Sequence, residues 1–148
     1  MTSKHDNMIN FCLQQAELSK CKDKKTAAIL VRADMTQIYS IGVNGGPAGG
    51  IDCLCQDETQ DKRKYSCVHA EQNCLVKAIA RDAEPKIMIC SKQPCAVCAS
   101  LIINSHNNIT EVWFVDDYWD NTGKDILIEA GIFVSQLVKF EKDKWCFK

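Results

Sequence analysis

The chain has 148 residues, of which 46% are hydrophobic and 25% are charged, the composition of an ordinary globular protein. Its 18 basic and 19 acidic residues nearly cancel, so it lacks the basic surface with which proteins hold long nucleic acid. No apolar run approaches the roughly 20 residues that cross a bilayer, and the polar first residues have no signal-peptide core. We therefore expect a single cytoplasmic domain over residues 1–148 that binds no membrane.

The hydrophobic pattern predicts helices and strands along most of the chain. Helical spacing of apolar residues predicts helices, and short runs rich in β-branched residues predict strands. In chain order these are a helix at 6–19, strands at 26–32 and 37–43, a helix at 68–81, a strand at 86–90, a helix at 94–105, a strand at 109–115, a helix at 124–130 and a strand at 132–138. The glycine-rich and polar stretch at 44–66 and the last ten residues are assigned no regular element.

This order predicts an α/β fold, a three-layer sandwich in which a five-stranded mixed sheet carries helices on both faces. The helix between the last two strands would make them parallel through a right-handed crossover. Trp113 is predicted to be a core residue of the penultimate strand. Ten cysteines are many for this length, and in a reducing compartment we expect Cys12, Cys74 and Cys90 to be small buried side chains.

Two short motifs offer three ligands for a metal ion. His69 lies in a His-Ala-Glu segment, and Cys95 and Cys98 belong to a later Pro-Cys-x-x-Cys segment. One imidazole and two thiolates suit tetrahedral zinc and leave the fourth position open, as in catalytic zinc sites. The two cysteines share one face of a helical turn, where a helix N-terminus stabilises thiolates. The alternative is a closed structural zinc knuckle with a fourth Cys or His ligand.

Glu71 follows the histidine by two residues, where it can move protons without being a ligand. This pairing of His-x-Glu with Pro-Cys-x-x-Cys is the signature of the zinc nucleobase deaminases, and it is recognised as such rather than derived from the spacing. In such enzymes zinc lowers the pKa of water towards about 7, and the glutamate carries protons to the ring and to the departing amine. Glu71 is therefore the predicted catalytic residue.

Further segments resemble the deoxycytidylate (dCMP) deaminases, in particular the small enzymes of phages. The segments that carry this resemblance are 19–21, 41–50, 69–73, 91–99, 117–118 and 127–132. The resemblance implies hydrolysis of dCMP to dUMP and ammonia, which supplies dUMP for thymidylate synthesis. It also implies that Asn44 binds the sugar hydroxyl, that Tyr118 packs over the substrate, and that the Ala70 amide and the Ser91 backbone contact the base.

The resemblance further implies nucleotide regulation and assembly. Members are typically homohexamers that dCTP activates and dTTP inhibits, with Mg²⁺ as a candidate companion ion. The implied effector-binding residues belong to the glycine-rich loop: Gly45, Gly46, Pro47, Ala48, Gly49 and Asp52. Glycines let backbone amides approach phosphates closely, although the same composition suits a plain surface turn.

Some phage members hold a second, structural zinc, and the resemblance places its ligands at Cys21, Cys53 and Cys67, with Cys55 or another residue as the fourth. The alternative is a set of ordinary thiols.

The chain also departs from the family, because Asp23 stands at a commonly basic position. The neighbouring lysines, Lys24 among them, could meet a nucleotide phosphate or belong to a solvated loop.

Two rival functions stay open at this point. One is another deaminase, acting on tRNA adenosine, cytidine or guanine. A tRNA enzyme would be expected to have a more basic surface, and free-cytidine enzymes usually carry Cys-Ala-Glu in place of His-Ala-Glu. The other rival is a non-catalytic zinc module, which would keep its metal without turning over nucleotides.

Overall fold

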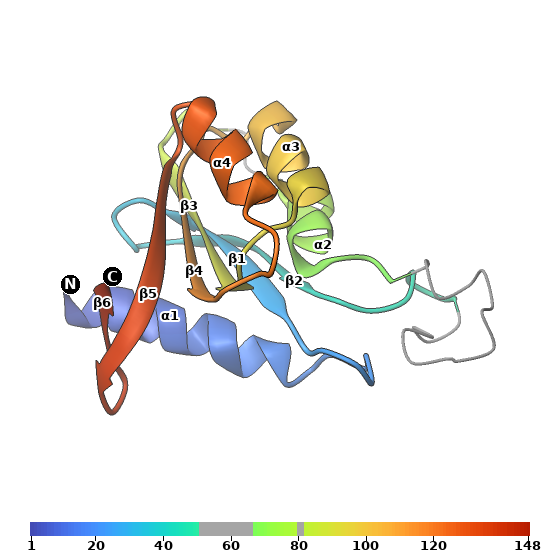
Figure 1. The fold of residues 1–148 in the computed structure, drawn as a ribbon, viewed down its shortest axis with the longest axis horizontal. Helices are drawn as coiled ribbons and strands as arrows, with labels where there is room; N and C mark the ends of the chain where they lie inside the picture. The colour runs from blue at the N-terminus through green and yellow to red at the C-terminus, as the bar shows by residue number, and fades with distance from the viewer. Residues whose placement is uncertain (51–66, 80–81) are drawn as a thin grey trace.

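The computed structural model describes residues 1–50, 67–79 and 82–148. Its elements, labelled in Figure 1, are α1 (Ser3–Ala16), β1 (Ala27–Arg32), β2 (Ile38–Val43), α2 (Ala70–Lys77), β3 (Lys86–Lys92), α3 (Ala96–Asn104), β4 (Ile109–Asp116), α4 (Thr122–Glu129), β5 (Phe133–Glu141) and β6 (Lys144–Phe147). Among the helices in these ranges, none is long and apolar enough to cross a membrane.

One mixed sheet organises the fold, with the strand order β2-β1-β3-β4-β5-β6. β1 pairs antiparallel with both β2 and β3, whereas β3, β4 and β5 run parallel. The predicted mixed sheet and the parallel pair of β4 and β5 are therefore confirmed. The parallel strands end at one edge of the sheet, which is where α/β proteins place their ligands.

The predicted number of strands was wrong, because the sheet has six strands within the described residues and not five. The additional strand, β6, pairs antiparallel with β5 in the tail that the sequence pattern left unassigned. Its Trp145 is 5% exposed, and the partners that hold it come from α1. The Trp145 backbone N–H donates to Asp6 Oδ1 at 3.0 Å, and its indole Nε1–H donates to Asn10 Oδ1 at 2.9 Å. Because these partners lie at the other end of the sequence, the local pattern around Trp145 could not predict the strand.

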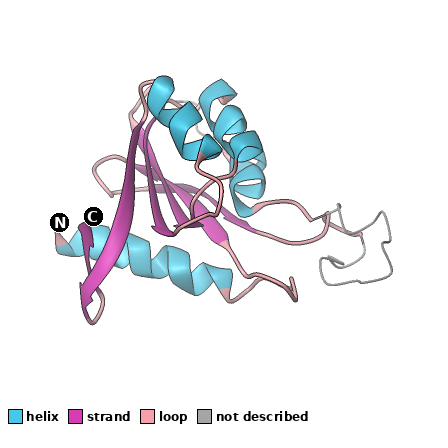
Figure 2. Ribbon diagram, in the orientation of Figure 1, coloured by secondary structure: helices cyan, strands magenta, loops and turns pink. Residues whose placement is uncertain are grey.

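Helices cover both faces of the sheet, as predicted. Figure 2 shows α1 alone on one face and α2, α3 and α4 together on the other. β1 is buried on both sides, since Ile29 and Val31 pack in the cluster under α1 while Ala28 and Leu30 pack in the cluster under the other helices. The predicted core residues Cys12, Cys74, Cys90 and Trp113 are all buried.

Several helix boundaries differ from the prediction. α1 begins three residues before the predicted start, where Thr2 caps it and its Oγ1 lies 2.6 Å from His5 Nδ1. α2 is shorter than predicted and ends at Lys77, because Ala78 takes an extended conformation. Pro94 was expected in the first turn of α3, but Cys95 is the N-cap, so the proline precedes the helix. These shifts make His69 and Cys95 the N-cap residues of their helices, while Cys98 lies in the first turn of α3.

Candidate active site

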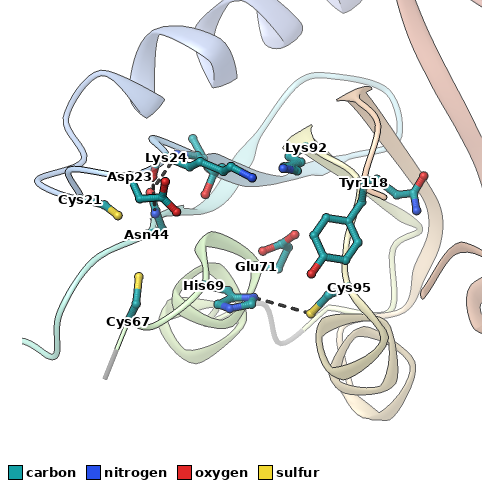
Figure 3. Close-up of a pocket in the computed structure, with 13 residues that line it drawn as sticks. Cys21, Asp23, Lys24, Asn44, Cys67, His69, Glu71, Lys92, Cys95 and Tyr118 are labelled. Atoms are coloured by element: carbon teal, nitrogen blue, oxygen red, sulfur yellow. Dashed lines mark hydrogen bonds between the residues drawn. The ribbon is translucent and has the colours of Figure 1, made fainter. Parts of the chain in front are cut away.

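Two helix N-termini bring the predicted metal ligands together. His69 is the N-cap residue of α2 and Cys95 is the N-cap residue of α3, with Cys98 one turn into α3. The His69 Nδ1 atom lies 3.6 Å from Cys95 Sγ and 3.4 Å from Cys98 Sγ. Figure 3 shows the His69 ring turned toward the Cys95 sulfur. The three ligand atoms lie within 4.8 Å of one another.

These separations fit zinc. Bonds of about 2.1 Å to nitrogen and about 2.3 Å to sulfur at tetrahedral angles place the two ligand atoms about 3.6 Å apart. The observed distances from Nδ1 to the two sulfurs are 3.6 and 3.4 Å. Within the described ranges, these residues are the one group of His, Cys, Asp and Glu side chains close enough to hold a metal ion. The donor set and its spacing therefore suit a zinc ion bound by three protein ligands.

The surroundings shift the pKa values of the two sulfurs in opposite directions. Hydrogen bonds from the Cys98 thiol and the His69 ring lower the pKa of Cys95 to about 3. The same contact with Cys95, together with burial, raises the pKa of Cys98 well above its ordinary value. The hydrogen bond to Cys95 also raises the pKa of His69. These shifts favour loss of the proton from Cys95 first, and a bound cation would compete with the protons of Cys98 and His69.

Glu71 faces the same point from the first turn of α2 and is 8% exposed. Its Oε2 atom lies 3.7 Å from Cys98 Sγ. Burial raises the pKa of the Glu71 carboxyl to about 6. A carboxyl group whose pKa lies near neutrality both accepts and returns protons readily, which suits a general acid–base role.

Two glycines allow this geometry through close backbone contacts. A Cβ atom at Gly42 of β2 would lie 2.0 Å from the Ala70 carbonyl oxygen, so the glycine lets β2 approach the start of α2. A Cβ atom at Gly123 of α4 would lie 2.3 Å from the Pro94 carbonyl oxygen and 2.6 Å from the Cys95 carbonyl carbon. Gly123 therefore sets how closely α4 packs on the cysteine motif. Neither residue was predicted, because such contacts join segments far apart in the chain.

The site opens into a pocket of about 360 Å³. Its described lining residues are Cys21, Asp23, Lys24, Thr26, Ala27, Asn44, Cys67, His69, Glu71, Lys92, Gln93, Cys95 and Tyr118. Figure 3 shows Glu71 between the metal-ligand candidates and the lysines, with the Tyr118 ring beside it. The pocket thus joins the predicted catalytic group to cationic and aromatic side chains.

The four predicted substrate-binding residues are placed differently from one another. Asn44 and Tyr118 line the pocket, whereas Ala70 and Ser91 are not among its described lining residues. The Ser91 hydroxyl oxygen accepts the Ala27 backbone N–H at 2.9 Å and so joins β3 to β1. Ala70 is the first residue of α2, and its backbone N–H is one of the donors that a helix leaves without an intrahelical partner.

The Asn44 side chain organises the segment that precedes β1. Its Oδ1 accepts the Thr26 backbone N–H and the Ser19 hydroxyl, each at 2.8 Å. Its Nδ2 donates to the Lys24 carbonyl oxygen at 2.7 Å. Because an amide nitrogen carries two hydrogens, the second N–H has no partner among the described residues and can donate to a ligand in the pocket.

Two pocket residues, Lys92 and Gln93, were missed by the sequence reasoning. The Gln93 side chain is 3% exposed, its Nε2 donates to the Asp120 carbonyl oxygen at 3.1 Å, and its Oε1 has no partner among the described residues. Gln93 thereby holds the loop that carries Tyr118. The one signal in the sequence was adjacency, since both residues stand directly before the Pro-Cys motif.

The predicted effector and second-metal residues are only partly described. Cys21 and Cys67 both line the pocket, on the side of His69 away from Cys95 (Figure 3), while Cys53 and Asp52 lie outside the described residues.

In the glycine-rich loop, Gly45 pairs with Val68 through N···O distances of 3.1 and 2.7 Å. The loop turns where the Gly50 N–H donates to the Pro47 carbonyl oxygen, with Gly49 at a φ of 71°. Its first residues are therefore tied to the segment that leads into His69.

Comparisons with known proteins agree with this site. The family described as "Cytidine and deoxycytidylate deaminase zinc-binding region" matches residues 2–115. The deoxycytidylate deaminase of Saccharomyces cerevisiae is 28% identical over 131 residues, which are 82% of this chain and 40% of the yeast protein. The mouse deoxycytidylate deaminase is 31% identical over 113 residues, which are 72% of this chain and 61% of the mouse protein. The chain thus spans only part of the length of these relatives.

Among solved structures, the dCMP deaminase from cyanophage S-TIM5 in complex with dCMP and dUMP aligns with a TM-score of 0.77 at 26% sequence identity. The alignment covers 92% of this chain and 98% of the phage protein. The similarity therefore extends over nearly the whole fold described above, including the strands and helices that hold the site.

Proposed function

The chain belongs to the cytidine and deoxycytidylate deaminase family, and we propose on this premise that it hydrolyses dCMP to dUMP and ammonia. The observation that carries the proposal is the meeting of His69, Cys95 and Cys98 with the buried Glu71 at one end of a pocket. The relatives that bear the name deoxycytidylate deaminase support the choice of dCMP. The product would supply dUMP for thymidylate synthesis.

In this proposal His69, Cys95 and Cys98 hold a zinc ion, which would lower the pKa of water and supply a nucleophile near neutral pH. Glu71 would take one proton from the attacking water and place it on N3 of the cytosine ring, which makes C4 electrophilic. After the bond from oxygen to C4 has formed, Glu71 would take the remaining proton of that oxygen and pass it to the exocyclic amine. The bond from C4 to nitrogen then breaks, and ammonia and a uracil ring result.

Other residues of the pocket would orient the substrate. Tyr118 lines the pocket beside Glu71, where its ring can pack on a base. The spare Asn44 N–H would donate to the sugar hydroxyl, and the Ala70 N–H at the start of α2 would donate to the base, with the Ser91 backbone as a further contact. Holding the base this way places C4 next to the nucleophile and excludes other poses.

Regulation and assembly are further parts of the proposal. The glycine-rich residues Gly45, Gly46, Pro47, Ala48 and Gly49, with Asp52, would bind dCTP as activator and dTTP as inhibitor, accompanied by Mg²⁺. A homohexamer would cover the apolar side chains that α2, α3 and the residues after α2 expose. These are Val76 at 84%, Ile79 at 76%, Val97 at 61% and Leu101 at 42% exposure.

The test is ammonia release by the zinc-loaded protein from dCMP, CMP, cytidine, guanine and tRNA, each with and without dCTP. We expect turnover of dCMP above all other substrates, and dUMP as the product. Turnover of guanine, cytidine or tRNA adenosine in preference to dCMP would assign the site to another deaminase. Retained zinc without ammonia from any of them would indicate a non-catalytic zinc module.

A further inference from the structure

The loop between β4 and α4 carries Tyr118 into the pocket. It runs from Asp116, the last residue of β4, to Asn121, the N-cap residue of α4. Figure 3 shows the Tyr118 ring extending toward Cys95. Among the described residues, the backbone of 117–119 forms no hydrogen bond. The position of the Tyr118 ring therefore depends on what holds the two ends of the loop.

Gln93 binds both ends of this loop. Its backbone N–H donates to the Asp116 carbonyl oxygen at 2.8 Å. Its side-chain Nε2 donates to the Asp120 carbonyl oxygen at 3.1 Å and to Asn121 Oδ1 at 3.4 Å. One residue thus spans the segment in which Tyr118 lies, with one bond before the tyrosine and two after it.

Gln93 also connects this loop to the metal-ligand candidates. It is the first residue after β3, and only Pro94 separates it from Cys95. The proline ring fixes one backbone dihedral angle of this short connection and restricts the conformation of the residue before it. On the other side, the Pro94 and Cys95 backbones pack against Gly123 of α4. The position of Tyr118 relative to Cys95 is therefore determined by a short and stiff connection through Gln93.

The Gln93 amide occupies this position at a cost to stability. The residue is 3% exposed, and its Oε1 atom is buried without a hydrogen-bond partner among the described residues. A buried acceptor without a donor destabilises a protein at least as much as one ordinary hydrogen bond stabilises it. The bonds from Nε2 to the loop therefore bring little net stability, because the same amide leaves Oε1 unpaired. What the amide provides is a defined loop conformation, and with it a defined position of the Tyr118 ring.

Resting on the proposed function, we propose that Gln93 is a positioning residue that acts on the reaction through Tyr118. With the loop bound at both ends, the Tyr118 ring stays where it can pack on the base, and the substrate meets a preformed pocket. Without the Nε2 bonds, each substrate molecule would have to order the loop as it binds, and the entropy lost in this ordering weakens binding. The effect of Gln93 should therefore appear mainly in KM.

The test compares Gln93→Met with Gln136→Met, each loaded with zinc. Methionine is close to glutamine in length and removes the amide. Gln136 is the matched control, because its Nε2 also donates to a backbone carbonyl oxygen at 3.1 Å, that of Val115 within β4 and outside the loop. Hydrogen–deuterium exchange of residues 117–121 measures the order of the loop without turnover. Steady-state kinetics with dCMP, in the wild type and in a Tyr118→Ala background, measure the effect on the reaction.

We expect Gln93→Met to raise the KM for dCMP about fivefold, the equivalent of one neutral hydrogen bond, with kcat and Tm close to those of the wild type. Exchange at 117–121 should become faster in Gln93→Met and stay at the wild-type rate in Gln136→Met. In the Tyr118→Ala background, Gln93→Met should raise KM no further, because the ring through which Gln93 acts is absent.

Three results would each overturn the inference: wild-type exchange of the loop in Gln93→Met, an equal rise in KM with and without the Tyr118 ring, or a Tm far below that of the wild type. The last would show that the amide acts on the stability of the whole fold. If the wild type does not turn over dCMP, the proposed reaction fails, and the exchange rates alone decide whether Gln93 holds the loop.

Discussion

Gly123→Ala tests whether close packing of α4 positions the Cys95 ligand. The added Cβ would lie 2.3 Å from the Pro94 carbonyl oxygen, whereas ordinary contacts begin at 3.4 Å, so one segment must move by about 1 Å. Overpacking against backbone atoms, which cannot rotate away, costs about 3 kcal/mol. Alanine regains about 1 kcal/mol over glycine within a helix. The net destabilisation is about 2 kcal/mol, which lowers Tm by about 4–8 °C in a chain of this size.

Thermal unfolding followed by circular dichroism measures this change, and zinc retention against a competing chelator measures its effect on the site. We expect weaker zinc retention and at least a tenfold loss of kcat/KM, because a displacement of about 1 Å at a reacting centre is costly. Gly45→Ala is the control for Tm and zinc retention in the absence of effector nucleotides, since a Cβ there meets no described atom within 4 Å. A Gly123→Ala protein with the Tm and zinc retention of the wild type would refute the packing argument.

Three further predictions concern stability and metal content. Asp6→Ala removes the acceptor of the Trp145 backbone N–H. We expect the free energy of unfolding to fall by about 1–3 kcal/mol and hydrogen exchange in β6 to become faster. Unchanged exchange in β6 would contradict the role of Asp6 in anchoring that strand. Removal of zinc by a chelator should abolish turnover and lower Tm, and added zinc should restore both, because a ligand that binds only the folded state stabilises it. A second, structural zinc near Cys21 and Cys67 predicts two zinc ions per chain by elemental analysis, and one ion per chain would dismiss it.

The meeting of His69, Cys95 and Cys98 could be predicted because the signal of each motif is local. Cys95 and Cys98 are three residues apart, which places them on one helical face, and their residue types leave few alternatives to zinc. The alternation of helices and strands could also be predicted, because apolar residues recur at different spacings in helices and in strands. The layers of the sandwich and the direction of its parallel strands followed from the order of these elements.

What the sequence did not reveal depends on contacts between distant segments. β6 spans only Lys144–Phe147, which is too short to show a strand pattern of its own, and it is held by α1 through the bond between Trp145 and Asp6. Gly123 lay in the loop before the predicted helix at 124–130, and only the structure shows its contact with Pro94. Lys92 stands at the end of a strand, and its place in the pocket follows from the path of β3 and not from its neighbours in sequence.

The proposed reaction requires a zinc site at which Glu71 carries protons. The most direct test measures dUMP and ammonia formed from dCMP by the wild type and by Glu71→Gln at equal zinc content. We expect both proteins to bind one catalytic zinc ion per site and the variant to lose at least about a hundredfold in kcat, the contribution typical of a positioned general acid–base. Wild-type turnover by the zinc-loaded variant, or no dUMP from the wild type, would contradict the proposed chemistry.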